Sequence, residues 1–279
     1  MQYDVIETFQ KASIQHGKSS DRIYLMHLGN ANPDTLASDL IKFARKKNYT
    51  KIFAKIPADK SDAFMQEGYI KESTILNFYD GRKDVVFASF FLDQQRANPE
   101  SKDEIENIIS LALKKANTNN SKKLSSDFNI RKCNVSDVIE MSKLYKEVFE
   151  TYPFPIHIPQ YLAETMETHI DYFGVWQNKQ LVALSSAEMD LQHKCVEMTD
   201  FATLPSFRGY GFAYHLLKVM ESKMFEKNMK TAYTIARAKS PGMNITFAKK
   251  GYEFAGTLIN NTNISGSIES MNIWYKALL

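Results

Sequence analysis

A short pattern that occurs twice constrains the fold of this chain more than any other feature of its sequence. The segment FMQEGY, residues 64–69, shares its Phe, Gly and Tyr positions with the segment FAKKGY, residues 247–252. The sequence around each copy predicts strands and helices in the same order, so the match extends beyond six residues. We therefore predict two copies of one half-fold, of which the first has diverged.

The apolar periodicity predicts the elements of each half. In the first half it predicts strands at 22–28 and 51–56, helices at 36–47 and 62–67, and a hairpin formed by 70–80 and 85–92. In the second half it predicts strands at 128–132, 172–177, 181–190, 195–204 and 231–236, helices at 136–149, 160–169, 212–227 and 244–249, and a closing hairpin formed by 256–263 and 270–276. This alternation indicates an α/β fold, with helices packed on a mixed sheet.

A polar segment divides the two halves. Residues 117–126 read NTNNSKKLSS, a composition typical of a linker, and a helical pattern precedes them at 99–116. A length of 279 residues also fits two average domains. We predict an N-terminal domain of residues 1–116, a linker of residues 117–126 and a C-terminal domain of residues 127–279.

Composition narrows the class of protein. Hydrophobic residues make up 44% of the chain and charged residues 24%, as in ordinary globular proteins. Positive and negative residues nearly balance, with a net charge of +3, which does not indicate nucleic acid as the main partner. The longest apolar run, residues 85–92, is too short to span a membrane. Cys133, Cys195 and the six histidines fit no metal-ligand spacing. We expect a cytoplasmic protein that uses no metal, nucleic acid or membrane; the oligomeric state stays open, a homodimer included.

The strongest local signal is a glycine-containing loop between a predicted strand and an amphipathic helix. Its glycines permit a tight turn in which backbone N–H groups converge, and the helix N-terminus behind them adds partial positive charge. The arginine offers a bidentate grip on phosphate. The loop has neither the P-loop nor the dinucleotide-binding pattern. We predict that it holds a pyrophosphate, the alternative being a helix start that binds nothing; its residues are Arg208, Gly209, Tyr210, Gly211, Phe212 and Ala213.

This loop, followed by a strand, a short helix and F-x-x-x-G-Y, resembles the acetyl-CoA-binding core of the GNAT N-acetyltransferases over about residues 128–275. The resemblance implies a GNAT fold for the second half and a diverged GNAT-like first half. It also implies that the loop amides hold the pyrophosphate of CoA. The backbone of the preceding strand would pair with the pantetheine arm, through Phe201, Ala202, Thr203 and Leu204.

Two longer stretches resemble the β-lysine N-acetyltransferases in particular. They are EMTDFATLPSFRGYG, residues 197–211, and the segment from ARAKSPGMN to NIWYK, residues 236–276. That family acetylates the side-chain amine of β-lysine to give a compatible solute, and it carries an N-terminal extension of about this length. The resemblance implies an enzyme that uses acetyl-CoA and a small-molecule amine.

The sequence departs from the common GNAT pattern at two positions. Phe247 stands where many members have a tyrosine that protonates the leaving thiolate, and phenylalanine cannot donate a proton. Another hydroxyl or water would then serve. Ser240 stands where an asparagine often contacts CoA, and Asn244 is a plausible substitute unless it merely begins a helix.

Amine acetylation needs a neutral amine, and a lysine-type amine has a pKa of about 10.4. A carboxylate on the strand before the loop is the expected base. Strand alternation places Glu197 on the face of Phe201 and Thr203, and Asp200 on the opposite face. A bulge, frequent in this strand of the family, would shift that alternation. We favour Glu197 as the base, with Asp200 as the alternative. For each of them, the competing interpretation is an acid at the strand edge that is solvated and has no catalytic role.

The acceptor site is less well defined by the sequence. The family usually closes over its acceptor with the loop between the first two helices, which here contains Tyr152, Phe154 and His157. The last hairpin would offer amide groups from Asn260, Asn261 and Asn263, although polar residues near a turn are often only solvated.

The loop of the first half that corresponds to the phosphate loop, residues 29–34, lacks an arginine. Pro33 removes an N–H donor there, and Asp34 would repel a phosphate. We therefore expect the first half to be structural or gating and to bind no CoA.

Two classes of function remain. The first is an N-acetyltransferase for β-lysine or another amine, such as a polyamine, lysine or a peptide. The second is an acetyl-CoA-binding or sensing module with weak or no catalysis, which Phe247 would fit.

Overall fold

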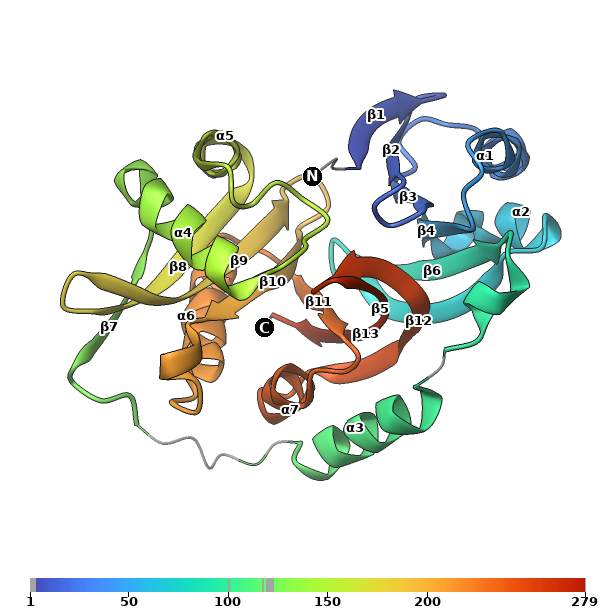
Figure 1. The fold of residues 1–279 in the computed structure, drawn as a ribbon. Helices are drawn as coiled ribbons and strands as arrows, with labels where there is room; N and C mark the ends of the chain where they lie inside the picture. Colours follow the sequence, from blue (N-terminus) through green and yellow to red (C-terminus); the bar gives the residue numbers. More distant parts are fainter. Residues whose placement is uncertain (1–3, 100, 117, 119–122, 279) are drawn as a thin grey trace.

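The computed structural model describes residues 4–99, 101–116, 118 and 123–278 (Figure 1). The first half contains β1 (Val5–Phe9), β2 (Ala12–Gly17), β3 (Arg22–His27), α1 (Pro33–Lys46), β4 (Lys51–Pro57), α2 (Ser61–Gln66), β5 (Ile70–Tyr79), β6 (Lys83–Phe91) and α3 (Lys102–Lys114). The second half contains β7 (Phe128–Lys132), α4 (Val138–Val148), α5 (Pro159–Thr168), β8 (Ile170–Gln177), β9 (Gln180–Asp190), β10 (Cys195–Thr203), α6 (Phe212–Glu226), β11 (Thr231–Arg237), α7 (Pro241–Lys249), β12 (Glu253–Ile264) and β13 (Ser267–Ala277).

The described strands form one 13-stranded mixed sheet, in the order β1-β2-β3-β4-β6-β5-β12-β13-β11-β10-β9-β8-β7. The two halves share one unit, in which three antiparallel strands lead through a helix to a parallel strand, and a hairpin follows a second short helix. β1, β2 and β3 begin this unit in the first half, and β8, β9 and β10 begin it in the second half, which carries β7, α4 and α5 in addition. The halves meet where β5 and β12 pair antiparallel, at Ser73 and Gly256.

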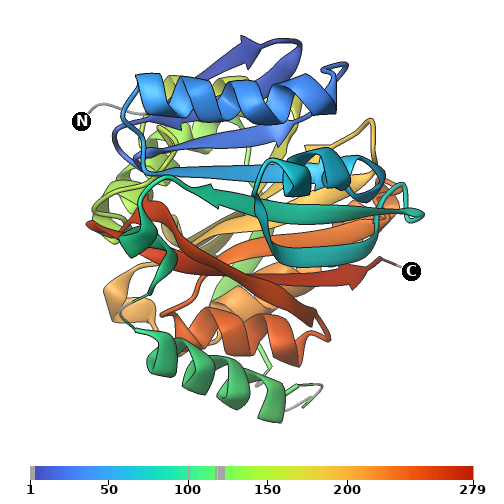
Figure 2. The same ribbon diagram turned by 90° about the vertical axis from the view of Figure 1, so that its right-hand side faces the viewer.

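The division into two domains stays a prediction. Residues 117 and 119–122 of the expected linker lie outside the described residues. Helix α3, expected to close the first half, packs on α7 of the second half (Figure 2), and Ala112 of α3 lies in the second half's core. The sequence did not predict β1 or β2. In β1, Val5 and Ile6 are exposed, so its pattern shows no buried face, whereas β2 is short and its buried positions include the polar residues Gln15 and His16.

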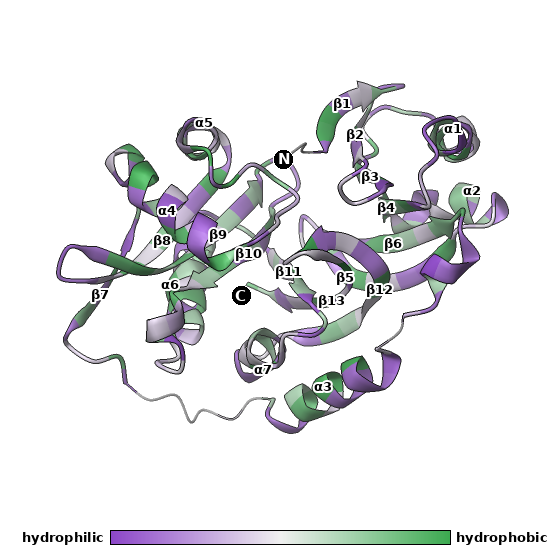
Figure 3. Ribbon diagram, viewed as in Figure 1, coloured by the Kyte–Doolittle hydropathy of each residue, from purple (hydrophilic) through white to green (hydrophobic). Residues whose placement is uncertain are grey.

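Helices cover the sheet on both faces. Helices α1 and α2 cover the first half, and α6 and α7 cover one face of the second half. Helices α4 and α5 cover the second half's other face. Figure 3 shows α3 with one apolar and one polar side, the pattern of a helix packed on a core. No helix among the described residues is long and apolar enough to cross a membrane.

The two halves share a buried core. Tyr24 and Phe53, from β3 and β4, belong to the same apolar cluster as Tyr233 and Ile273 of the second half. The rings of Phe78 and Tyr233 meet edge to face, with centroids 4.9 Å apart. The Phe78–Tyr233 contact joins β5 to β11, and the shared cluster as a whole holds β3 and β4 of the first half against the second half, beside the site described next.

Candidate active site

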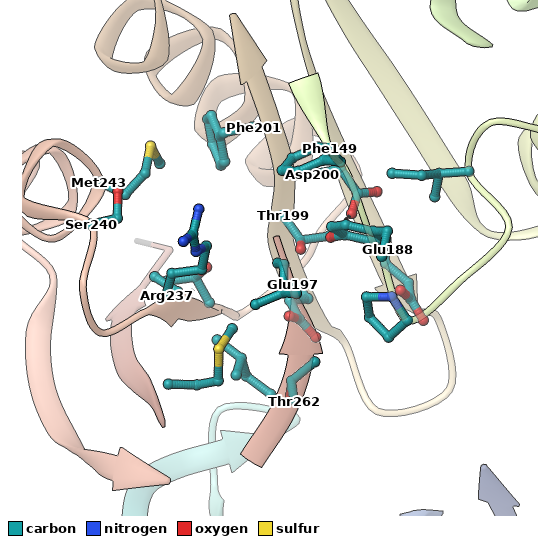
Figure 4. A pocket seen from close by; sticks show the side chains of 18 of the residues that line it. Phe149, Glu188, Glu197, Thr199, Asp200, Phe201, Arg237, Ser240, Met243 and Thr262 are labelled. Atoms are coloured by element: carbon teal, nitrogen blue, oxygen red, sulfur yellow. Dashed lines mark hydrogen bonds between the residues drawn. The ribbon is translucent and has the colours of Figure 1, made fainter. Parts of the chain in front are cut away.

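The site begins where two neighbouring strands separate. Strands β10 and β11 pair in parallel only from Cys195 to Glu197, opposite Thr231 to Tyr233. Beyond that point no pairing joins them, and a cavity of about 660 Å³ extends along their inner edges. Figure 4 shows Glu197, Thr199 and Phe201 along β10, with Arg237, Ser240 and Met243 across the cavity.

The glycine loop lies at one end of this cavity. Gly209 and Gly211 have φ angles of +90° and +75°, and Gly211 is the N-cap of α6. A Cβ built on either glycine would meet no atom within 4 Å, so open space lies beside this backbone. The first N–H groups of α6 have no helical partner and are available to an anion. These features fit the pyrophosphate of CoA.

Most residues predicted to hold the cofactor line the cavity: Phe201, Thr203, Arg208, Gly209, Gly211, Phe212, Ala213, Ser240 and Phe247. Four others do not line it. Ala202 and Leu204 are buried elsewhere, and Tyr210 is 54% exposed and stacks on Phe212 with ring centroids 5.5 Å apart.

The fourth, Asn244, has a structural place. It is fully buried, and its Nδ2 donates to the carbonyls of Arg237 and Ser240 at 3.0 and 2.8 Å. Its Oδ1 accepts from Asn272 Nδ2 at 2.8 Å and from Trp274 Nε1 at 2.9 Å. With these groups occupied, the structure does not offer Asn244 to CoA.

Phe247 borders the cavity only with carbon. Its side chain is fully buried and meets Phe201 edge to face, with ring centroids 5.7 Å apart. It therefore supplies packing surface, and the proton for a leaving thiolate must come from another group.

A cluster of acids lies at the point where β10 and β11 separate. Glu197 lies opposite Glu188 of β9 and Tyr233 of β11 in the sheet register, and all three line the cavity. Burial, and then the like charge of Glu188, raises the pKa of Glu197 to about 8. Burial and the charge of Asp200 raise the pKa of Glu188 to about 7. The ammonium of Lys55, from β4, partly offsets both shifts.

Asp200 also borders the cavity, because β10 bulges there. The register with β9 shifts between Thr199 and Ala202, and Asp200 has a φ of +55°. One oxygen of Asp200 accepts from the hydroxyl of Tyr152, and the other accepts from Ser186 Oγ at 2.5 Å. Burial raises the pKa of Asp200, against these hydrogen bonds. With both oxygens bound, Asp200 anchors the α4–α5 loop, whereas Glu197 keeps its place as the candidate base.

The predicted acceptor residues divide into two groups. Tyr152, Phe154 and Asn261 line the cavity. The cavity is not lined by His157, Asn260 or Asn263. The two asparagines instead make hydrogen bonds to other segments of the chain. Asn260 Nδ2 donates to the carbonyls of Arg96 and Asn98. Asn263 donates to the carbonyl of Ser19 and accepts from Thr151 Oγ1.

The first half also forms part of the cavity wall, which the sequence did not predict. Six lining residues come from β3 and β4: Arg22, Tyr24, Met26, His27, Phe53 and Lys55. Strand alternation places Arg22, Tyr24 and Met26 on one face of β3, and this much could be predicted from the sequence. That this face contacts the second half is shown only by the packing of the two halves.

The first half's own loop is closed to a ligand. A Cβ built on Gly29 would lie 2.4 Å from the carbonyl oxygen of Lys11, in contrast to the open space at Gly209 and Gly211. Asn32 caps α1 by accepting from the N–H of Asp34, so part of the helix N-terminus is already occupied. Among the described residues, no group of three or more His, Cys, Asp or Glu side chains is arranged to hold a metal.

Comparison with known proteins agrees with this geometry. The model of the "Acetyltransferase (GNAT) family" matches residues 138–252. The chain is 41% identical over 263 residues to the β-lysine N(6)-acetyltransferase of Methanococcus maripaludis, covering 94% of this chain and 95% of that protein. It is 32% identical to the Methanosarcina mazei protein of the same name (88% and 97% covered) and 32% identical to the N-acetyltransferase YodP of Bacillus subtilis (96% of each).

Proposed function

The chain belongs to the family of the β-lysine N(6)-acetyltransferases, within the GNAT acetyltransferases, and from this premise we propose that it transfers the acetyl group of acetyl-CoA to the N6 amine of β-lysine. The observation that carries the proposal is one cavity that joins a phosphate-binding loop to an acid cluster. Arg208, Gly209 and Gly211 lie at one end, and Glu188 and Glu197 lie where β10 and β11 separate. Acetyl transfer requires a loop that holds the acetyl donor and a base that takes the proton of the amine, and this cavity has a candidate for each.

We assign the donor half of the cavity to acetyl-CoA. The loop amides and Arg208 would hold the pyrophosphate, and the unpaired edge of β10 at Phe201 and Thr203 would receive the pantetheine arm. Bound there, acetyl-CoA supplies an activated acyl group. Phe247 and Met243 offer apolar contact along the same wall.

We assign the proton transfer to Glu197. The amine lone pair forms a bond to the acetyl carbon, the C–S bond breaks, and its electron pair leaves on sulfur as the CoA thiolate. The amine proton passes to Glu197 and then to solvent. A pKa of about 8 matches this role better than that of an exposed carboxylate, because a base is most effective when its pKa lies near the working pH. The thiolate takes its proton from water, since Phe247 has none to give.

The function is tested by incubating the purified chain with acetyl-CoA and β-lysine and following the release of CoA thiol. We expect steady turnover. A chain that binds acetyl-CoA but releases no thiol with β-lysine, lysine, ornithine or spermidine would instead be the binding or sensing module.

Arg208→Ala should weaken acetyl-CoA binding by about 1.5–3 kcal/mol, because it removes a charged donor to phosphate while the loop backbone stays. Isothermal titration calorimetry measures the change directly. Arg45→Ala, on the exposed side of α1, removes the same charge far from the cavity and should leave the affinity unchanged. Equal affinity in the wild-type chain and Arg208→Ala would remove Arg208 from the site.

A further inference from the structure

The first half presents a buried cation to the cavity. Arg22 of β3 is 4% exposed and lines the cavity. Its Nη1 donates to the carbonyl of Asn261 at 2.6 Å and to Thr262 Oγ1 at 3.0 Å. Its Nε has no hydrogen-bond partner, and no carboxylate of the described residues lies within 4.0 Å of its guanidinium. A buried charge without a counter-ion is costly, so an anion is expected there.

Two neighbouring cations, Lys51 and Arg96, are paired with carboxylates, in contrast to Arg22. Lys51 Nζ lies 3.3 Å from a carboxylate oxygen of Glu72, and Arg96 Nη1 lies 3.7 Å from one of Asp21. Burial, and then the charge of Arg96, lowers the pKa of Arg22 to about 10, which leaves it protonated at neutral pH. Of these three cations, Arg22 is the one without a carboxylate of the described part of the chain within 4.0 Å, and the more distant charge of Asp4 raises its pKa less than burial lowers it.

The acceptor side of the cavity is thus polarised. At one end of the acceptor side, Arg22 is hydrogen-bonded to Asn261 and Thr262. Glu188 and Glu197 form an acidic region elsewhere along the same cavity. Figure 4 shows both Thr262 and Glu197 at the cavity. Next to Arg22, Asn261 is 1% exposed, and its Oδ1 is a buried acceptor without a donor. Among the residues that the structure describes, the Arg22 end therefore offers a cation that has no carboxylate in contact and, beside it, an acceptor without a donor.

This pair of groups complements the head of a β-amino acid, which carries a carboxylate and an ammonium two carbons apart. We propose that Arg22 binds the carboxylate of the acceptor and that Asn261 Oδ1 accepts from the neighbouring ammonium. The first half then selects the head of the acceptor, while the second half acetylates its distal amine. This inference rests on the proposed function, with β-lysine as the acceptor.

The test compares two acceptors that differ only in the carboxylate, β-lysine and its decarboxylated analogue 1,4-diaminopentane. Arg22→Met should lower kcat/KM for β-lysine by about 10- to 100-fold, mainly through KM, as expected for loss of one charge-assisted hydrogen bond. With 1,4-diaminopentane, Arg22→Met and the wild-type chain should agree within about threefold, because that acceptor has no carboxylate to bind.

Two further variants separate recognition from structure. Arg22→Lys keeps the charge but replaces the three-nitrogen guanidinium with a single ammonium, so it should recover part of the β-lysine activity. It also serves as the test variant if Arg22→Met does not fold. Lys55→Met removes a second buried cation of the same wall, one that faces Glu188 and Glu197. It should therefore affect both acceptors to the same degree.

The outcomes are distinct. A loss confined to β-lysine in the Arg22 variants supports the proposal. Equal losses with both acceptors in folded Arg22 variants, or no loss with either, overturn it and leave Arg22 a structural residue that ties β3 to β12. A wild-type chain that acetylates neither acceptor would refute the proposed function itself, before Arg22 is tested.

Discussion

Glu197→Gln is expected to lower kcat by about 10²–10⁴-fold, the contribution of one general base. Glutamine keeps the shape of the side chain but cannot take the amine proton. Acetyl-CoA affinity should change little, because the loop at Arg208 to Gly211 lies at the other end of the cavity. In the wild-type chain kcat/KM should rise with pH through about 8, since Glu197 acts as a base only above its raised pKa. Steady-state assays of thiol release measure kcat and the pH dependence of kcat/KM, and isothermal titration calorimetry measures the acetyl-CoA affinity.

The neighbouring acids provide the controls. Asp200→Asn keeps an acceptor for one of the Tyr152 and Ser186 hydroxyls and presents an amide donor to the other, which that hydroxyl can accept. It should cost much less in kcat than Glu197→Gln. Glu188→Gln removes a like charge, so the pKa of Glu197 should fall and the rising limb should move to lower pH. If Asp200→Asn abolished turnover while Glu197→Gln kept it, the base would be Asp200.

Asn244→Leu should destabilise the folded chain by about 2–6 kcal/mol. The substitution strands two buried donors, Trp274 Nε1 and Asn272 Nδ2, each of which costs about 1–3 kcal/mol without its acceptor. Chemical denaturation measures the loss as a lower midpoint.

Ser240→Ala is the matched control at the start of the same helix. Ser240 takes part in the Asn244 network only through its carbonyl, so removing its hydroxyl should leave stability nearly unchanged. Unaltered stability in Asn244→Leu together with weaker acetyl-CoA binding would restore Asn244 as a cofactor contact.

Much of the fold follows from local patterns in the sequence. The loop at Arg208 to Ala213 and the helix behind it were predictable because two glycines between a strand pattern and an amphipathic helix permit a tight turn at the start of the helix. The predicted strand at 128–132 coincides with β7, and α6 differs from its predicted range by one residue. Strand β1 was not predictable, since an exposed edge strand leaves no alternation of buried and exposed positions.

The acceptor site was less predictable, because it depends on contacts between distant segments. Three asparagines of β12 look equivalent in sequence, yet Asn260 and Asn263 bond to the first half and Asn261 alone borders the cavity. Arg22 gave no signal of its own, since a lone arginine on a short strand is usually a surface residue. Its burial arises only when the faces of the two halves pack together.

The transfer of an acetyl group to the N6 amine of β-lysine is tested most directly by identifying the product. The wild-type chain is incubated with acetyl-CoA and an equimolar mixture of β-lysine, spermidine and a lysine-containing peptide, and the acetylated products are located and quantified by mass spectrometry and NMR. We predict N6-acetyl-β-lysine as the main product, formed with one equivalent of CoA thiol. A peptide lysine or spermidine acetylated faster than β-lysine, or β-lysine acetylated on its 3-amine, would contradict the account.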